Sequence, residues 1–135
     1  MKNVIFGVLA LAASASFASG FRCESEEGFK VKLYNQTKSG TRVPSKLIVS
    51  HENASPATLL VADGSEITKT NRLNTVRYTV DGSDMNLHQV ILQIKFKEGQ
   101  ETIREGEVVE GQLILVDEEG SREVSDLACE RYLKG

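Results

Sequence analysis

Hydrophobic and polar positions alternate with a period of two along much of this chain. The clearest example is residues 89–97, where Val90, Leu92 and Ile94 alternate with glutamine and lysine side chains. Successive side chains of a β-strand point to opposite faces of the sheet, so this pattern predicts a strand with one buried face. Ile91 is an apolar residue on the polar side, which indicates that the outer face of the strand is partly covered.

Similar patterns predict further strands, separated by turns that contain glycine, asparagine or aspartate. The predicted strands cover residues 29–34, 42–50, 57–62, 65–70, 74–81, 89–97, 112–117 and 122–133. The apolar run in 57–62 predicts a strand buried on both faces, and 65–70 is expected to return beside it. The last predicted strand does not alternate strictly, which suggests a bulge.

The spacing of these strands defines the fold class. Turn signals recur about every 8–12 residues, and no helical pattern follows residue 20. The pairs Asp63–Gly64 and Asp81–Gly82 are typical of tight turns that require a positive φ. The sequence therefore predicts an all-β protein, a small antiparallel β-barrel or β-sandwich of about seven to nine strands.

The first 18 residues differ in composition from the strands that follow. Met1–Lys2 begins the chain with a positive charge, an apolar run covers Val4–Ala13, and small residues continue to Gly20. A run this short does not span a membrane, which requires about 20 residues, and is typical of a secretory signal peptide. We expect cleavage after Ala18, or alternatively after Gly20, and a single exported β-domain over residues 21–135.

The charge of the chain limits the classes of partner. Its 135 residues include 16 Lys and Arg and 19 Asp and Glu, giving a formal net charge of −3, which becomes −4 when Lys2 is removed with the signal peptide. Nucleic acids and anionic membrane surfaces are bound by clustered cations, so neither is an expected partner. The mature chain is long enough for one domain, and we expect no stable membrane insertion.

The two cysteines, Cys23 and Cys129, lie near the ends of the mature chain, Cys23 just upstream of the first predicted strand. In an exported protein with no other cysteine, one disulfide bond is the simplest expectation. Closing a loop of about 100 residues stabilises a fold by up to about 4.7 kcal/mol in the chain-entropy model. A lipid on Cys23 fits the preceding residues poorly, and a zinc site normally takes four ligands.

Acidic residues gather between positions 98 and 119, where Arg104 is the one basic residue. They are Glu98, Glu101, Glu105, Glu107, Glu110, Asp117, Glu118 and Glu119. The functional interpretation is a patch that binds a cationic protein or a divalent ion. The alternative is a solvated hairpin that keeps a sheet edge soluble. The sequence lacks the Asp-x-Asp-x-Asp-Gly calcium loop, which weakens the ion interpretation.

The sequence contains no signature of a catalytic, metal or cofactor site. Neither His51 nor His88 has a serine-hydrolase elbow or a zinc-binding motif near it, so surface histidines are the simpler interpretation. We therefore expect no metal and no cofactor. The rival hypothesis is a small hydrolase that uses a serine or carboxylates at the mouth of a barrel. An interior filled by its own side chains would favour binding over that hypothesis.

Several features resemble the small β-barrel inhibitors of c-type lysozyme that occur in bacterial envelopes. They are Phe21–Arg22–Cys23 at the start of the exported part, the alternating strands, Ser39–Gly40 and the closing Cys129. The family's Ser-Gly-x-x-Tyr segment is not matched, because no tyrosine follows Gly40 at that spacing. The resemblance implies an envelope protein similar to a lysozyme inhibitor.

The sequence therefore predicts a periplasmic or extracellular β-domain that acts by binding and not by catalysis, with the lysozyme inhibitor and the small hydrolase as alternatives. Charge is unevenly distributed along it. Residues 21–70 carry seven basic and six acidic side chains, whereas residues 71–135 carry eight and thirteen. If the protein has a macromolecular partner, we expect that partner to be cationic and to meet residues 98–119.

Overall fold

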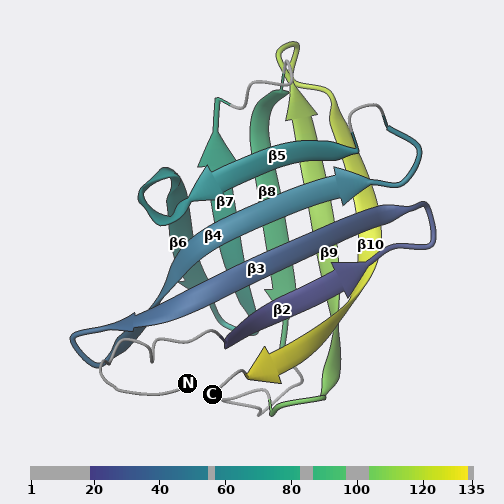
Figure 1. Ribbon diagram of the computed structural model, residues 1–135. Helices are drawn as coiled ribbons and strands as arrows, with labels where there is room; N and C mark the ends of the chain where they lie inside the picture. Colours follow the sequence, from purple (N-terminus) through teal and green to yellow (C-terminus); the bar gives the residue numbers. More distant parts are fainter. Residues whose placement is uncertain (1–18, 55–56, 83–86, 97–103, 134–135) are drawn as a thin grey trace, which may run out of the picture.

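The computed structural model contains one antiparallel sheet of nine strands that curves into a nearly closed barrel (Figure 1). It describes residues 19–54, 57–82, 87–96 and 104–133. The strands are β2 (Ser19–Glu24), β3 (Phe29–Lys38), β4 (Thr41–His51), β5 (Thr58–Asp63), β6 (Ile67–Arg72), β7 (Thr75–Asp81), β8 (Leu87–Lys95), β9 (Val108–Asp117) and β10 (Arg122–Leu133). One 3-10 turn, η2 (Gly64–Glu66), separates β5 from β6. The prediction of an all-β fold is confirmed.

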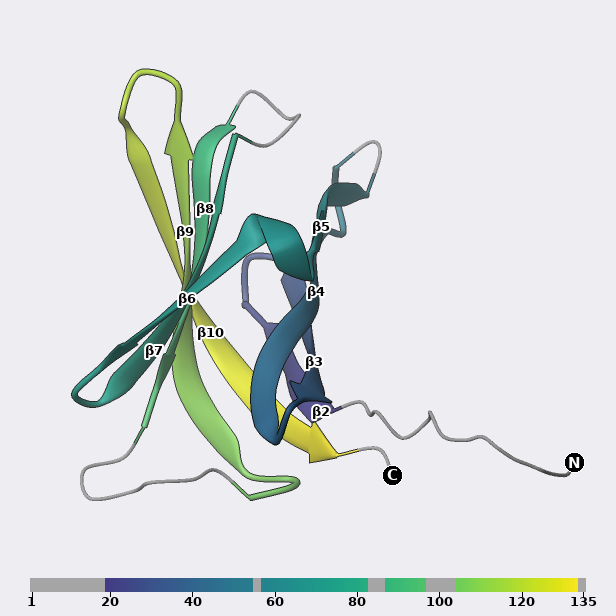
Figure 2. The same ribbon diagram turned by 90° about the vertical axis from the view of Figure 1, so that its left-hand side faces the viewer.

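The sheet consists of two runs of strands that are sequential in the chain. One run is β2 to β5 and the other is β6 to β10, and β10 pairs with β2, so the order is β5-β4-β3-β2-β10-β9-β8-β7-β6. Figures 1 and 2 show that the first run crosses the second at a steep angle, which folds the sheet over on itself. β5 and β6 therefore lie at the two ends of the sheet. The predicted pairing of residues 57–62 with 65–70 is wrong, because η2 redirects the chain and β6 pairs with β7.

A single core receives inward-facing side chains from all nine strands. Strand β8 behaves as its pattern predicts, because Val90, Leu92 and Ile94 are each 0% exposed. On its other face Ile91 is also buried and packs with Ile114 and Val116 in a small outer cluster. The partly covered outer face predicted for this strand is thus confirmed.

Three local predictions are corrected by the structure. Cys23 lies inside a strand, β2, and not upstream of the first one. Strand β5 is not buried on both faces, because it ends the sheet and Val61 is 55% exposed. Strand β10 keeps a continuous register with β9 and has no bulge there. Its alternation is hard to see in the sequence because two of its inward residues, Ser125 and Arg131, are polar.

Within the residues that the structure describes, none of the helical segments has the length and apolar character needed to cross a membrane.

Candidate functional site

The interior of the barrel is filled by its own side chains. Those that are buried most completely come from strands in both halves, and the largest are Leu33, Leu47, Leu92, Ile94 and Leu113. Protein interiors packed in this way leave little room for a ligand. A partner is therefore expected to bind on the outer face or at the edges of the sheet.

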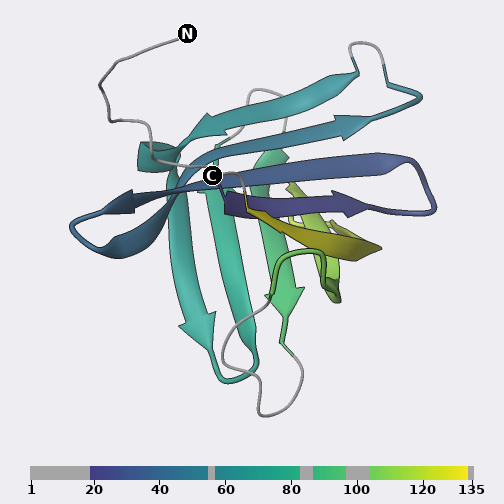
Figure 3. The ribbon, with the colours of Figure 1, turned by 60° about the horizontal axis from the view of Figure 1, so that its bottom comes forward.

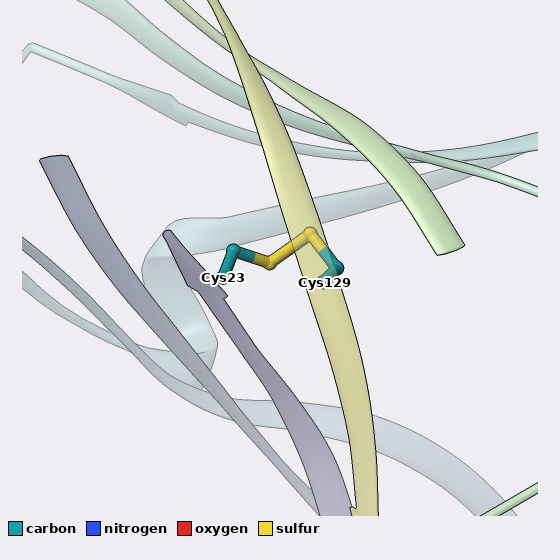
Figure 4. The surroundings of a disulfide bond; sticks show 2 residues. All are labelled: Cys23 and Cys129. Carbon is teal, nitrogen blue, oxygen red and sulfur yellow. A yellow bond between two sulfur atoms is a disulfide. The ribbon is translucent and has the colours of Figure 1, made fainter. Parts of the chain in front are cut away.

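The disulfide Cys23–Cys129 joins β2 to β10 inside this core (Figure 4). The two cysteines are directly opposite in the ladder, with Cα atoms 4.0 Å apart, and are 1% and 0% exposed. Gly111 on β9 leaves space for the bond, because a Cβ atom there would lie 2.8 Å from Cys129 Sγ and 2.9 Å from the Gln93 carbonyl oxygen. The predicted disulfide is present in the structure.

A shallow hollow lies outside the disulfide, on the outer face of β2, β10 and β9. It has a volume of about 360 Å³ and is lined by Arg22, Glu24, Val108, Ala128 and Glu130. The register explains it, because the small side chain of Ala128 stands between Glu24 on β2 and Glu110 on β9. We refer to this feature as the Ala128 hollow.

Carboxylates outnumber cations around the Ala128 hollow. Glu24 and Glu130 line it, Glu110 is opposite Ala128 in the ladder, and Asp126 is the preceding outward residue of β10. Gln112 Nε2 donates a hydrogen bond of 3.3 Å to Asp126 Oδ1. Arg22 is the one cation in the lining, and its Nη2 is 3.9 Å from Glu130 Oε1. On the β3 side, Lys30 and Lys32 stand opposite Glu24 and Arg22. Four carboxylates therefore surround three cations, and the acidic excess lies on the β10 and β9 side of the hollow.

Two tyrosines, Tyr132 and Tyr34, lie beside Arg22 at the end of the hollow opposite Glu24. The guanidinium carbon of Arg22 is 5.0 Å from the centre of the Tyr132 ring, and that ring packs edge-on against Tyr34 at 6.1 Å. The two tyrosines flank Gly20 in the register of β10, β2 and β3. Burial, reinforced by Tyr34, raises the pKa of Tyr132.

The structure divides the predicted acidic run into two groups at opposite ends of β9. Glu105, Glu107 and Glu110 lie at or before the start of β9, near the Ala128 hollow. Asp117, Glu118 and Glu119 lie at the turn into β10, roughly 25 Å away at the usual rise per strand residue. Glu98 and Glu101 lie outside the described residues.

Two of these carboxylates have a structural role in turns. Asp117 Oδ1 accepts hydrogen bonds from the backbone N–H groups of Glu119 and Ser121, at 2.9 and 2.8 Å. Glu107 Oε1 accepts one of 3.0 Å from Arg104 N. Glu110 is the member of the predicted run that the register places beside the hollow, because it faces Ala128.

Both histidines belong to local structure. His51 packs edge-on against Phe29 with ring centres 4.6 Å apart, and its Nδ1 accepts a hydrogen bond of 3.0 Å from Asn53 N. His88 is exposed at a register shift in β8, and its carbonyl oxygen accepts a 2.9 Å hydrogen bond from Gly82 N. Among the described residues there is no group of three or more His, Cys, Asp or Glu side chains that could hold a metal ion.

Sequence reasoning missed Arg22, Glu24, Asp126 and Glu130, although a signal for them existed. If Cys23 and Cys129 are read as opposite residues of an antiparallel ladder, Arg22 falls opposite Glu130 and Glu24 opposite Ala128. The disulfide was predicted only as a covalent link. If the disulfide had also been used to set the register of the first and last strands, the acidic site would have been predicted on three adjacent strands and not within residues 98–119.

Comparison with known proteins finds no match to a family model, to a curated protein or to a solved structure. Two of the features behind the resemblance to lysozyme inhibitors have structural roles here. Ser39 and Gly40, with φ of 51° and 79°, form the two-residue turn between β3 and β4, and Cys129 belongs to the disulfide.

Proposed function

We propose that this chain is a non-enzymatic, exported protein that binds a cationic protein at the Ala128 hollow. The observation that carries the proposal is the register that places Glu24 and Glu110 on either side of Ala128. Two strands from distant parts of the chain, β2 and β9, thereby supply carboxylates to one open hollow on the outer face.

The hollow suits a lysine or arginine side chain of the partner. The aliphatic part of such a side chain can lie on Val108 and Ala128, since Val108 is 56% exposed. Its charged end can then reach Glu24, Glu110 or Asp126, none of which forms an ion pair within the described residues. Long basic side chains commonly bury their carbon chain while the charged end stays at the surface.

The packed interior supports binding over the hydrolase alternative. A site at a barrel mouth needs an open interior with a nucleophile within reach of a base. Here the core is occupied by its own side chains, His51 packs on Phe29, and His88 is exposed on β8.

Export to the periplasm or the extracellular space belongs to the same proposal. Disulfide bonds persist mainly in oxidising compartments, and the Cys23–Cys129 bond supports such a location. The predicted signal peptide, residues 1–18, lies outside the described residues. A lysozyme of the c type is a basic protein, so the resemblance in the sequence makes it a suitable first probe.

Binding can be tested by measuring association rates to an immobilised c-type lysozyme and to cytochrome c, a second basic protein. The test variant is Glu24→Lys with Glu110→Lys. Its matched control is Glu118→Lys with Glu119→Lys, which changes the net charge equally at the far end of β9. We expect association at low salt to slow by about tenfold in the test variant and much less in the control.

Salt dependence gives a second readout of the same interaction. Exposed charges are screened beyond about 8 Å at physiological ionic strength, so association should slow as salt rises. Equal slowing in both variants would reduce the effect to overall charge and contradict the Ala128 hollow as the site. Absence of binding to either basic protein at low salt would contradict the cationic partner.

A further inference from the structure

The two ends of the sheet leave an open seam between β6 and β4. Among the strands that the structure describes, β6 is hydrogen-bonded to β7 alone, and β5 pairs with β4 only from Lys46 onward. The start of β4, residues 41–44, is therefore paired with β3 on one side, and no described strand pairs with it on the other. Two unpaired strand edges thus face the same gap, one from each half of the barrel.

The seam is narrow at one end and opens along β6. At the narrow end η2 crosses close to β4, where a Cβ atom on Gly64 would lie 2.5 Å from the Pro44 carbonyl oxygen. Figures 2 and 3 show β6 leaving η2 and diverging from β4. A groove of about 450 Å³ occupies this region. Its lining residues are Gln36, Val43, Pro44, Ser45, Gly64, Ser65, Ile67 and Lys69.

The backbone of β6 can accept another strand. In an antiparallel pair, alternate residues direct their N–H and C=O groups away from the partner, so the outer edge of β6 presents a row of them. Residues 68–72 are exposed, contain no proline, and include the β-branched Thr68 and Thr70. A six-residue strand is about 20 Å long, which is enough to pair with five or six residues of an extended peptide.

Cations border the groove from both sides. Lys69 lines it on the β6 side and is opposite Tyr78 of β7 in the ladder. Arg42 directly precedes Val43, which lines the groove on the β4 side, and its charge opposes the rise in the pKa of Tyr78 that burial causes. Neither Arg42 nor Lys69 forms an ion pair with a described carboxylate. Glu66 is the near carboxylate on η2, and its Oε1 accepts a hydrogen bond of 2.9 Å from Asp63 N.

We propose that the seam between β6 and β4 binds an extended, acidic segment of a partner protein by adding it as a strand to the open edge of β6. Backbone hydrogen bonds to β6 hold the segment, and Arg42 and Lys69 select acidic side chains. This is the binding mode in which main-chain pairing gives affinity and flanking side chains give specificity. The surface is separate from the Ala128 hollow and takes a partner of opposite charge, so either proposal can fail without the other.

The test uses the mature protein with its disulfide formed and labelled with ¹⁵N. The probe is an acetylated and amidated peptide of eight residues in which glutamate alternates with valine and threonine. We expect shift changes and slower hydrogen exchange at the amides of β6 on titration. A peptide with lysine in place of glutamate should bind at least about tenfold more weakly, because the seam is cationic.

A third peptide separates strand addition from attraction between charges. It keeps the glutamates but carries N-methyl groups on alternate residues, which removes the donors along one edge. We expect it to lose protection of the β6 amides. Equal binding by the methylated and unmethylated acidic peptides would overturn strand addition.

Charge reversal tests whether Arg42 and Lys69 select the acidic peptide. We expect Arg42→Glu with Lys69→Glu to weaken the acidic peptide by about tenfold. The matched control is Lys30→Glu with Lys32→Glu on the outer face of β3, which should leave its affinity nearly unchanged. Equal loss in both variants would overturn the role of the seam. Dimerisation that protects β6 without any peptide would show that a second copy occupies the edge, which would also overturn the proposal.

Discussion

The two halves of the barrel meet at two seams that are held in different ways. At the seam between β2 and β10, six residue pairs run from Ala128–Glu24 to Leu133–Ser19, and the disulfide lies within this ladder. On the inner face of this seam, the guanidinium carbon of Arg131 lies 5.2 Å from the centre of the Phe21 ring. At the seam between β6 and β4, no ladder joins the described strands, and contact is made chiefly through η2 and the start of β6.

The closed seam and the open seam divide two tasks in this barrel. A covalent bond and a ladder hold one seam, whereas the other has no continuous pairing among the described strands. Open edges invite pairing with other chains, and charged or polar residues restrict which chains can add. Lys69 and the exposed threonines of β6 fit that role. The closed seam is therefore mainly a source of stability, and the open one supplies backbone groups for recognition.

Removal of the disulfide should lower the free energy of unfolding more than any other change at the two seams. We expect Cys23→Ser with Cys129→Ser to lower the free energy of unfolding by about 2–5 kcal/mol, because the bond closes nearly the whole mature chain. Urea denaturation of the variant gives the value, and wild-type protein treated with dithiothreitol is the control. An unchanged midpoint would mean that the ladder alone holds the closed seam.

Two identical substitutions compare packing beside the closed seam with packing on the end strand β5. Leu33 on β3, beside the closed seam, is 0% exposed, whereas Leu60 on the end strand β5 is only partly buried. We expect Leu33→Ala to cost about 2–5 kcal/mol and Leu60→Ala about 1 kcal/mol, because the partly buried side chain on the end strand loses less apolar contact. Denaturant unfolding of both variants measures the difference. Equal costs would contradict the looser packing inferred at β5.

The pH dependence of stability tests the burial of Tyr78 in the core next to the open seam. Burial raises the pKa of Tyr78 from 10.0 to about 12, with Arg42 opposing the shift. The folded state therefore holds the phenol proton more tightly than the unfolded state. This contribution is complete below pH 10 and is lost as the pH rises through about 12, by up to about 3 kcal/mol.

Tyr78→Phe should flatten the decline in unfolding free energy between pH 10 and 12. Tyr132, whose pKa is also raised, should leave part of the slope in the variant. Urea unfolding at a series of alkaline pH values measures both curves. Parallel curves for wild type and variant would show that Tyr78 does not titrate as its burial requires.

The smallest effect on stability is expected on the outer face of the closed seam, at the Arg22–Glu130 pair. Their side chains are 57% and 48% exposed, and the nearest charged atoms are 3.9 Å apart. Exposed ion pairs contribute about 0.2–1 kcal/mol, so a double-mutant cycle with Arg22→Ala and Glu130→Ala should give a coupling energy in that range. A coupling well above 1 kcal/mol would assign this surface pair a larger part in holding the seam.

The all-β class and the buried faces of the clearest strands follow from the local sequence pattern. The period-two pattern in β8 predicted the buried faces of Val90, Leu92 and Ile94, because alternation depends only on local backbone geometry. The segment 122–133 was predicted with the bounds that β10 has. The disulfide could be inferred too, because two cysteines and an expected export signal leave few alternatives.

Tertiary structure alone decided which strands are neighbours, and with it both candidate surfaces. Alternation says which face of a strand is buried but not which strand lies beside it, so 65–70 was wrongly paired with 57–62. The Ala128 hollow needs β2 beside β10, more than 100 residues away in the chain. The open seam exists because η2 turns β6 away from β5. Both depend on contacts between distant segments, whose pairing is fixed by closure of the common core and not by any local pattern.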